Sequence, residues 1–70
     1  MSLEYLEGEL ARLVEEAKRY RDYLEKLETA KAEGKIAETA YGELKKEYTM
    51  KLAKLEEEIR ELQEAKKRAP

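Results

Sequence analysis

The chain has 70 residues, 46% of them charged, and its formal net charge is only −2 because acidic and basic residues are interspersed. This length allows one small domain, and the mixture of signs argues against a dedicated nucleic-acid-binding or membrane-binding surface. Cysteine and histidine are absent, which excludes disulfides, thiolate metal sites and the commonest general base.

The first predicted element is a helix over about residues 3–33. Its apolar residues recur at every third or fourth position, a spacing that places them on one side of a helix. Ser2 is a suitable N-cap, and Glu4 favours the positive end of the helix dipole. The apolar stripe consists of Leu3, Leu6, Leu10, Leu13, Ala17, Tyr20, Leu24 and Leu27.

A short turn over residues 34–37 follows. Gly34 stands where a left-handed residue closes a helix, and Lys35 and Ile36 complete a tight connection.

The second predicted helix covers about residues 38–68. The apolar residues of this stripe are spaced four residues apart on both sides of Tyr48, instead of alternating between three and four. Such a shift from the regular heptad spacing relaxes the supercoil locally. The shift either makes room for the rings of Tyr20 and Tyr48 or marks the place where a partner docks. The stripe of this helix consists of Tyr41, Leu44, Tyr48, Leu52, Leu55, Ile59 and Leu62.

The two stripes match when the helices run antiparallel. In each facing pair the two residue numbers then add up to nearly the same value, as expected for antiparallel helices. No charged residue falls inside the central seam. Leu13, Leu55 and Ile59 should be almost fully buried, whereas the pairing lapses at the open end, where Leu6 meets Ala65 or Lys66. We therefore predict an all-α, antiparallel two-helix coiled-coil hairpin. The facing pairs are Leu27 with Leu44, Leu24 with Tyr48, Tyr20 with Leu52, Ala17 with Leu55, Leu13 with Ile59 and Leu10 with Leu62.

Charge placement agrees with this arrangement. Glutamates dominate the first helical turns, and the chain ends with Lys66, Lys67 and Arg68. An antiparallel hairpin brings these opposite charges side by side. The same pattern also suits the dipoles of two separate helices, so it supports the hairpin without proving it.

Nothing in the sequence indicates an active site. The carboxylate clusters Glu15-Glu16 and Glu56-Glu57-Glu58 fall largely off the seam and are typical of solvated helix faces, and no glycine-rich phosphate loop is present. We therefore expect no enzymatic activity, no catalytic residue, no cofactor and no metal site.

One segment keeps nucleic-acid binding open as an alternative function. Lys18-Arg19-Tyr20-Arg21 with Tyr23 interleaves bases and aromatic rings, as nucleic-acid-binding surfaces often do. However, acidic residues surround the run, and pairs four residues apart such as Asp22 with Lys26 explain most of it. The alternative is thus a nucleic-acid-gripping helical arm of a larger protein.

Protein–protein interaction is the function that we favour from the sequence. A lone hairpin of this size has a small core, and doubling into a four-helix bundle would cover more apolar surface. We therefore expect a homodimer or another helical protein as partner. The candidate interface consists of Tyr5 and Tyr23 on one flank of the seam, Val14 on the other flank, and Met50, which faces outward with Ala53.

The turn region resembles a known family. Leu27, the stretch Gly34-Lys35-Ile36-Ala37-Glu38-Thr39-Ala40-Tyr41 and Lys45 are similar to the short C-terminal (SHOCT) helical-hairpin pattern. This resemblance implies an oligomerisation or localisation tail. The chain departs from the pattern where Ala37 replaces the capping Ser/Thr and Ala40 replaces a glutamate, so the capping box is lost.

The remaining composition bears on location and source. No apolar run approaches the roughly 20 residues that span a bilayer, and no signal peptide is visible, so we expect a soluble cytoplasmic protein. Asparagine is absent, Gln63 is the one glutamine, and Glu and Lys are abundant. Hyperthermophile proteins share this composition, as do long solvated helices of mesophiles.

Overall fold

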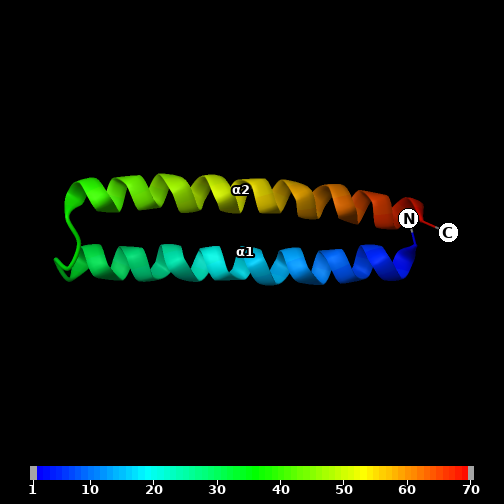
Figure 1. Cartoon of the computed structure of the whole chain (residues 1–70), viewed down its shortest axis with the longest axis horizontal. Helices are drawn as coiled ribbons and strands as arrows, with labels where there is room; N and C mark the ends of the chain where they lie inside the picture. Colours follow the sequence, from blue (N-terminus) through cyan, green and yellow to red (C-terminus); the bar gives the residue numbers. More distant parts are fainter. Residues whose placement is uncertain (1, 70) are drawn as a thin grey trace.

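The computed structural model describes residues 2–69 as two long helices joined by one short turn (Figure 1). Helix α1 spans Leu3–Ala32 and helix α2 spans Glu38–Arg68. They run antiparallel and side by side along their whole length, in a rod with extents of 52 × 14 × 12 Å. The predicted all-α helical hairpin is therefore confirmed.

The start of α1 is capped as its sequence predicts. The Ser2 side chain accepts a hydrogen bond from the backbone N–H of Tyr5 at 3.2 Å, which satisfies one of the donors that a helix leaves free at its first turn.

The turn is built on a left-handed glycine. Gly34 has a φ of 69°, and its N–H donates to the carbonyl of Lys31 at 3.0 Å, while the N–H of Lys35 donates to the carbonyl of Ala30 at 2.9 Å. These two bonds form a Schellman motif, which ends α1 and reverses the chain. Helix α2 begins after Ala37, whose side chain makes no capping hydrogen bond.

The core is a single seam between the helices. Leu13, Ala17 and Leu55 form its centre, and half-buried apolar side chains from both helices pack against them. The cluster and its packed neighbours include both members of three predicted facing pairs, Leu13 with Ile59, Ala17 with Leu55 and Tyr20 with Leu52. No polar or charged residue is buried in the described part of the chain. The packed neighbours of the cluster are Tyr20, Leu52, Ile59 and Leu62.

One expectation about the seam is wrong, and one residue at the open end is more buried than its predicted pairing suggests. Ile59 is half-buried rather than fully buried, and it packs against the edge of the central cluster instead of belonging to it. Leu6, at the end where the pairing was expected to lapse, is only 1% exposed. The helices stay adjacent there, since Lys66 Nζ lies 4.0 Å from Glu7 Oε2.

Three ion pairs connect the helices at their flanks. They join Glu7 with Lys66, Arg21 with Glu56 and Glu28 with Lys45, at 4.0, 3.3 and 3.4 Å respectively. Their side chains remain about half exposed, so each pair contributes little to the stability. Their effect is to favour the antiparallel register, in agreement with the predicted charge placement.

Candidate interaction surface

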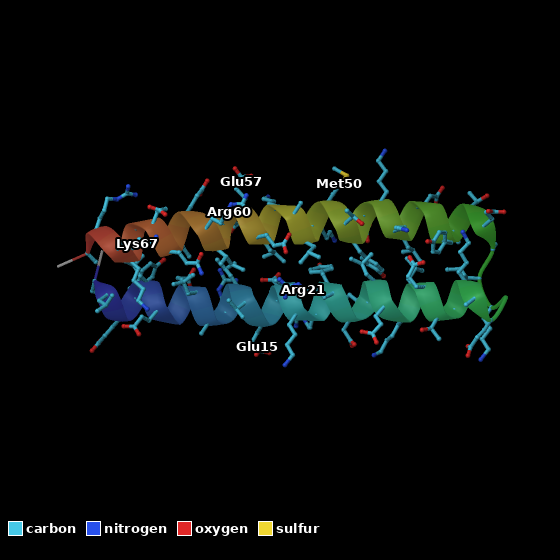
Figure 2. The ribbon with its side chains drawn as sticks, turned by 180° about the vertical axis from the view of Figure 1, so that it is seen from behind. Glu15, Arg21, Met50, Glu57, Arg60 and Lys67 are labelled. Carbon is cyan, nitrogen blue, oxygen red and sulfur yellow. The ribbon has the colours of Figure 1, made fainter. Side chains whose placement is uncertain are left out.

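The four residues of the predicted interface are exposed but do not form one patch. Their exposed fractions range from 41% for Tyr23 to 62% for Met50. Val14 and Tyr23 are nine residues apart and therefore lie on opposite sides of α1, whereas Tyr5 lies on the same side as Tyr23 but five turns away. Met50 points away from α1 on the outer face of α2 (Figure 2).

Tyr23 belongs instead to a cluster of three aromatic rings. Its ring centroid lies 5.6 Å from that of Tyr20, edge to face, and 5.5 Å from that of Tyr48 on the other helix. The rings of Tyr20 and Tyr48 are 6.0 Å apart. These separations are typical of favourable aromatic contacts. The cluster lies where the two four-residue steps meet, so the phase shift of α2 accommodates the rings.

The three rings present free hydroxyl groups. No hydrogen bond within residues 2–69 involves the hydroxyl of Tyr20, Tyr23 or Tyr48, whereas the hydroxyl of Tyr41 is fully engaged. A tyrosine with an apolar body and a free polar tip is a side chain that protein interfaces favour. The three hydroxyl groups therefore have no hydrogen-bond partner among the described residues.

A groove between the helices begins beside Tyr20. It has a volume of about 240 Å³ and receives side chains from both α1 and α2. Tyr20 and Leu55 provide its apolar part, and the other side chains carry both signs of charge. We call it the Tyr20 groove, and its lining consists of Glu16, Tyr20, Lys51, Lys54, Leu55 and Glu58.

An ionic cluster borders the Tyr20 groove on the side of the open end. Arg12 binds Glu9 through two hydrogen bonds of 3.1 and 3.3 Å and reaches Glu16 at 3.5 Å. The hydrogen bond from Arg12 lowers the pKa of Glu9, and the same bond raises the pKa of Arg12. Glu16 also lines the Tyr20 groove, so this residue connects the ionic cluster to the groove.

A second polar site lies near the turn, around Tyr41. Its ring is buried, and its hydroxyl donates to the carboxylate of Glu28 at 2.8–2.9 Å and accepts from Lys45 Nζ at 3.0 Å. Lys31 Nζ lies 4.0 Å from the centroid of the same ring, within the range of a cation–π interaction. This network links α1 to α2 next to the turn, and the sequence analysis missed it because Tyr41 was assigned to the seam alone.

The network shifts the pKa values of its charged members. The hydrogen bond from Tyr41 is the main cause that lowers the pKa of Glu28 below its usual value of 4.5, with Lys45 adding to the effect. The hydrogen bond to Tyr41 is also the main cause that raises the pKa of Lys45. The Glu28 contribution to stability is thus present above the unfolded-state pKa and lost as the pH falls through the folded-state pKa. The Lys45 contribution is present below its unfolded-state pKa and lost as the pH rises through its folded-state pKa.

We expect Tyr41→Phe to lower the melting temperature at pH 7 by a few degrees, because the ring stays buried but Glu28 and Lys45 lose their shared partner. The difference from the unchanged protein should shrink as the pH falls through the lowered folded-state pKa of Glu28, where its carboxylate becomes protonated. Circular dichroism melts at several pH values measure both effects.

Tyr5→Phe is the matched control for this substitution. The hydroxyl of Tyr5 makes no hydrogen bond within residues 2–69 and its side chain is exposed, so its removal should leave the melting temperature unchanged. An equal effect of both substitutions at pH 7 would contradict a stabilising role of the Tyr41 network.

The basic run of α1 is distributed over different surroundings. Tyr20 is half-buried in the aromatic cluster, and Arg21 points toward α2, where its guanidinium pairs with Glu56 at 3.3 Å (Figure 2). Lys18, Arg19 and Arg21 border one small hollow, but acidic side chains alternate with them there: Glu15, Asp22 and Glu25. The run therefore does not form a continuous basic surface.

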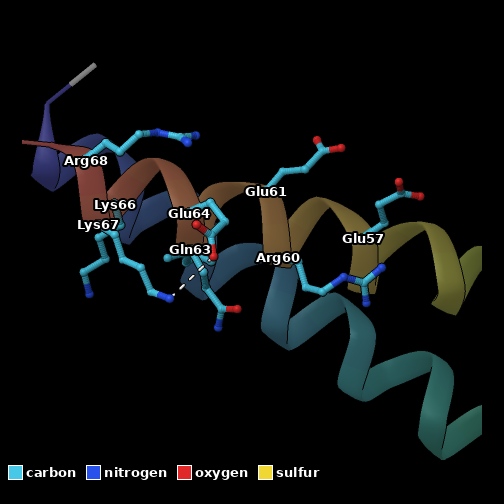
Figure 3. Close-up of a pocket in the computed structure, with 9 residues that line it drawn as sticks. Glu57, Arg60, Glu61, Gln63, Glu64, Lys66, Lys67 and Arg68 are labelled. Atoms are coloured by element: carbon cyan, nitrogen blue, oxygen red, sulfur yellow. Dashed lines mark hydrogen bonds and ion pairs between the residues drawn. The ribbon is translucent and has the colours of Figure 1, made fainter.

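A broad depression lies along α2 near its end (Figure 3). It has a volume of about 1180 Å³, but Leu10 is its one contribution from α1, and the remaining side chains project from α2. Arg60 and Lys67 point to one side of the helix and Glu61 to the other (Figure 3). A hollow formed around one helix is open to water, so we regard it as solvated surface.

Comparisons with protein-family models, with curated proteins and with solved structures found no match for this chain. Within residues 2–69 there is no group of three or more His, Cys, Asp or Glu side chains that could hold a metal ion. Neither α1 nor α2, as described, is long and apolar enough to cross a membrane.

Proposed function

We propose that this hairpin is a non-enzymatic coiled-coil module for protein–protein interaction, which self-associates into a homodimer with the form of a four-helix bundle. The observation that carries the proposal is the accessible surface. The chain exposes 5385 Å², whereas a compact monomer of 8.2 kDa exposes about 4,500 Å². The excess of about 850 Å² is close to the area of about 800 Å² that one partner buries in a standard interface.

The size of the core supports the same proposal. The buried residues of the described chain form one narrow seam, with Leu13, Ala17 and Leu55 at its centre. A core this small rarely supplies more than about 3–5 kcal/mol of stability. Association of two hairpins adds stability by mass action, and the partly exposed aromatic cluster supplies contact area of the kind that interfaces use.

The resemblance of the turn to SHOCT hairpins also favours this function, since that family implies an oligomerisation or localisation tail. The turn keeps the glycine of the pattern in its left-handed conformation. The uncapped start of α2 at Ala37 is one of the two points at which the chain departs from the family pattern.

Sedimentation equilibrium and thermal melting over a range of concentrations test the proposal. We expect a mass of twice 8.2 kDa at high micromolar concentration and a melting temperature that rises with protein concentration. A mass of 8.2 kDa together with concentration-independent melting would contradict self-association.

A titration with a generic duplex and a generic single strand separates this function from a nucleic-acid-binding arm. We expect no binding at 50 mM salt. Binding that weakens steeply as salt increases would instead favour the arm.

A further inference from the structure

The Tyr20 groove combines three kinds of chemistry within one small space. Leu55 and the ring of Tyr20 are its apolar walls, Glu16 and Glu58 bring carboxylates, and Lys51 brings an ammonium group 5.8 Å from the Tyr20 ring centroid. An aromatic ring with a polar tip can use all three at once: burial for its ring, a carboxylate for its hydroxyl and a cation at its face.

The chain already contains a tyrosine in such surroundings. Tyr41 buries its ring, donates its hydroxyl to the Glu28 carboxylate and lies close to the ammonium groups of Lys31 and Lys45. The Tyr20 groove offers the same set of contacts, but no side chain of the described residues occupies it in the manner of Tyr41.

Tyr23 is the side chain best placed to fill this groove from a second copy. It is 41% exposed and its hydroxyl is free of hydrogen bonds within residues 2–69. Tyr23 cannot fill the groove of its own chain, because the two extend from Tyr20 in opposite directions along the rod. The Cα of Tyr23 lies about 4.5 Å from that of Tyr20 toward the turn, and the Cα of Glu16 lies about 6 Å from it toward the open end.

A two-fold axis between two copies can place Tyr23 of one copy over the Tyr20 groove of the other. An axis that passes through Tyr20 perpendicular to the rod reverses the direction of the second hairpin, so the turn side of one copy faces the open-end side of the other. Tyr23 of each copy then lies over the Tyr20 groove of its partner. Both contacts form together, as a two-fold symmetric interface requires.

We propose that a second copy of this chain docks by inserting its Tyr23 into the Tyr20 groove, with the two hairpins antiparallel about a two-fold axis at Tyr20. This inference rests on the proposed self-association and specifies the face that carries it.

The first test compares two identical substitutions on α1. Tyr23→Ala removes the inserted ring, and Tyr5→Ala removes an exposed ring five turns away on the same side of the helix. Sedimentation equilibrium should show a dissociation constant at least about 30-fold higher for Tyr23→Ala, as expected for a central aromatic anchor. It should change less than about threefold for Tyr5→Ala.

The second test changes the groove and leaves the aromatic cluster intact. Lys51→Glu places a third carboxylate beside Glu16 and Glu58, and Lys46→Glu makes the same change at an exposed position on the outer side of α2. We expect the dissociation constant to rise at least about tenfold for Lys51→Glu and little for Lys46→Glu.

Mixing the two weakened variants gives the sharpest result. Each homodimer lacks both contacts, whereas a mixed dimer of Tyr23→Ala with Lys51→Glu keeps one intact groove filled by one intact Tyr23. The mixed pair should therefore bind more tightly than either variant alone. The helix content of each variant, measured by circular dichroism, identifies any loss that comes from unfolding.

The outcomes distinguish this inference from the proposed function. A monomeric unchanged protein would overturn both. A dimer whose dissociation constant responds equally to Tyr23→Ala and Tyr5→Ala, or whose mixed pair shows no recovery, would overturn the docking of Tyr23 and leave self-association standing.

Discussion

Leu13→Ala is expected to lower the free energy of unfolding by about 2–5 kcal/mol, the range observed for buried leucines. Leu13 is buried at the centre of the seam, packed with Ala17 and Leu55, so its truncation leaves a cavity that a single neighbouring helix can close only in part. Because the whole hairpin core supplies about 3–5 kcal/mol, a loss at the upper end of this range would leave most of the variant unfolded at 25 °C. Urea titration monitored by circular dichroism, at one fixed protein concentration, measures the loss.

The neighbouring residue supplies the control. Val14 is exposed, and Val14→Ala should change the stability by no more than about 0.5 kcal/mol. If both substitutions had the same small effect, Leu13 would not lie in the seam and the antiparallel register would be wrong.

Leu6→Ala should cost about 2 kcal/mol, because Leu6 is 1% exposed and has the largest fully buried side chain of the described residues. We expect a value at the low end of the range for leucines, since Leu6 lies in the first turns of α1, where the helix can adjust to a smaller side chain. Chemical denaturation at neutral pH measures this loss.

Leu3→Ala makes the same chemical change one turn earlier, at a side chain that is 40% exposed. Its effect should stay within about 0.5 kcal/mol. A loss for Leu6→Ala as small as that for Leu3→Ala would mean that the open end frays in solution.

The sequence by itself determined the architecture of the hairpin. A 3-4 apolar spacing dictates which side of each helix is buried, and Gly34 can adopt the left-handed conformation that ends α1 at almost no cost. The nearly constant totals of the facing residue numbers gave the register, and Ala17, Leu55 and their neighbours pack accordingly. These features depend on local backbone geometry and on helical periodicity, so the amino-acid sequence is enough to predict them.

Only the tertiary structure decided how side chains on the flanks of the seam combine. Tyr23 was recognised as exposed, but its contact with Tyr48 and the groove beside Tyr20 depend on the rotation of the two helices about their own axes. The bond from Tyr41 to Glu28 likewise depends on side-chain rotamers at the helix crossing. Periodicity gives the direction of a side chain only to within part of a turn, and contacts of a few ångströms between helices require the packed geometry itself.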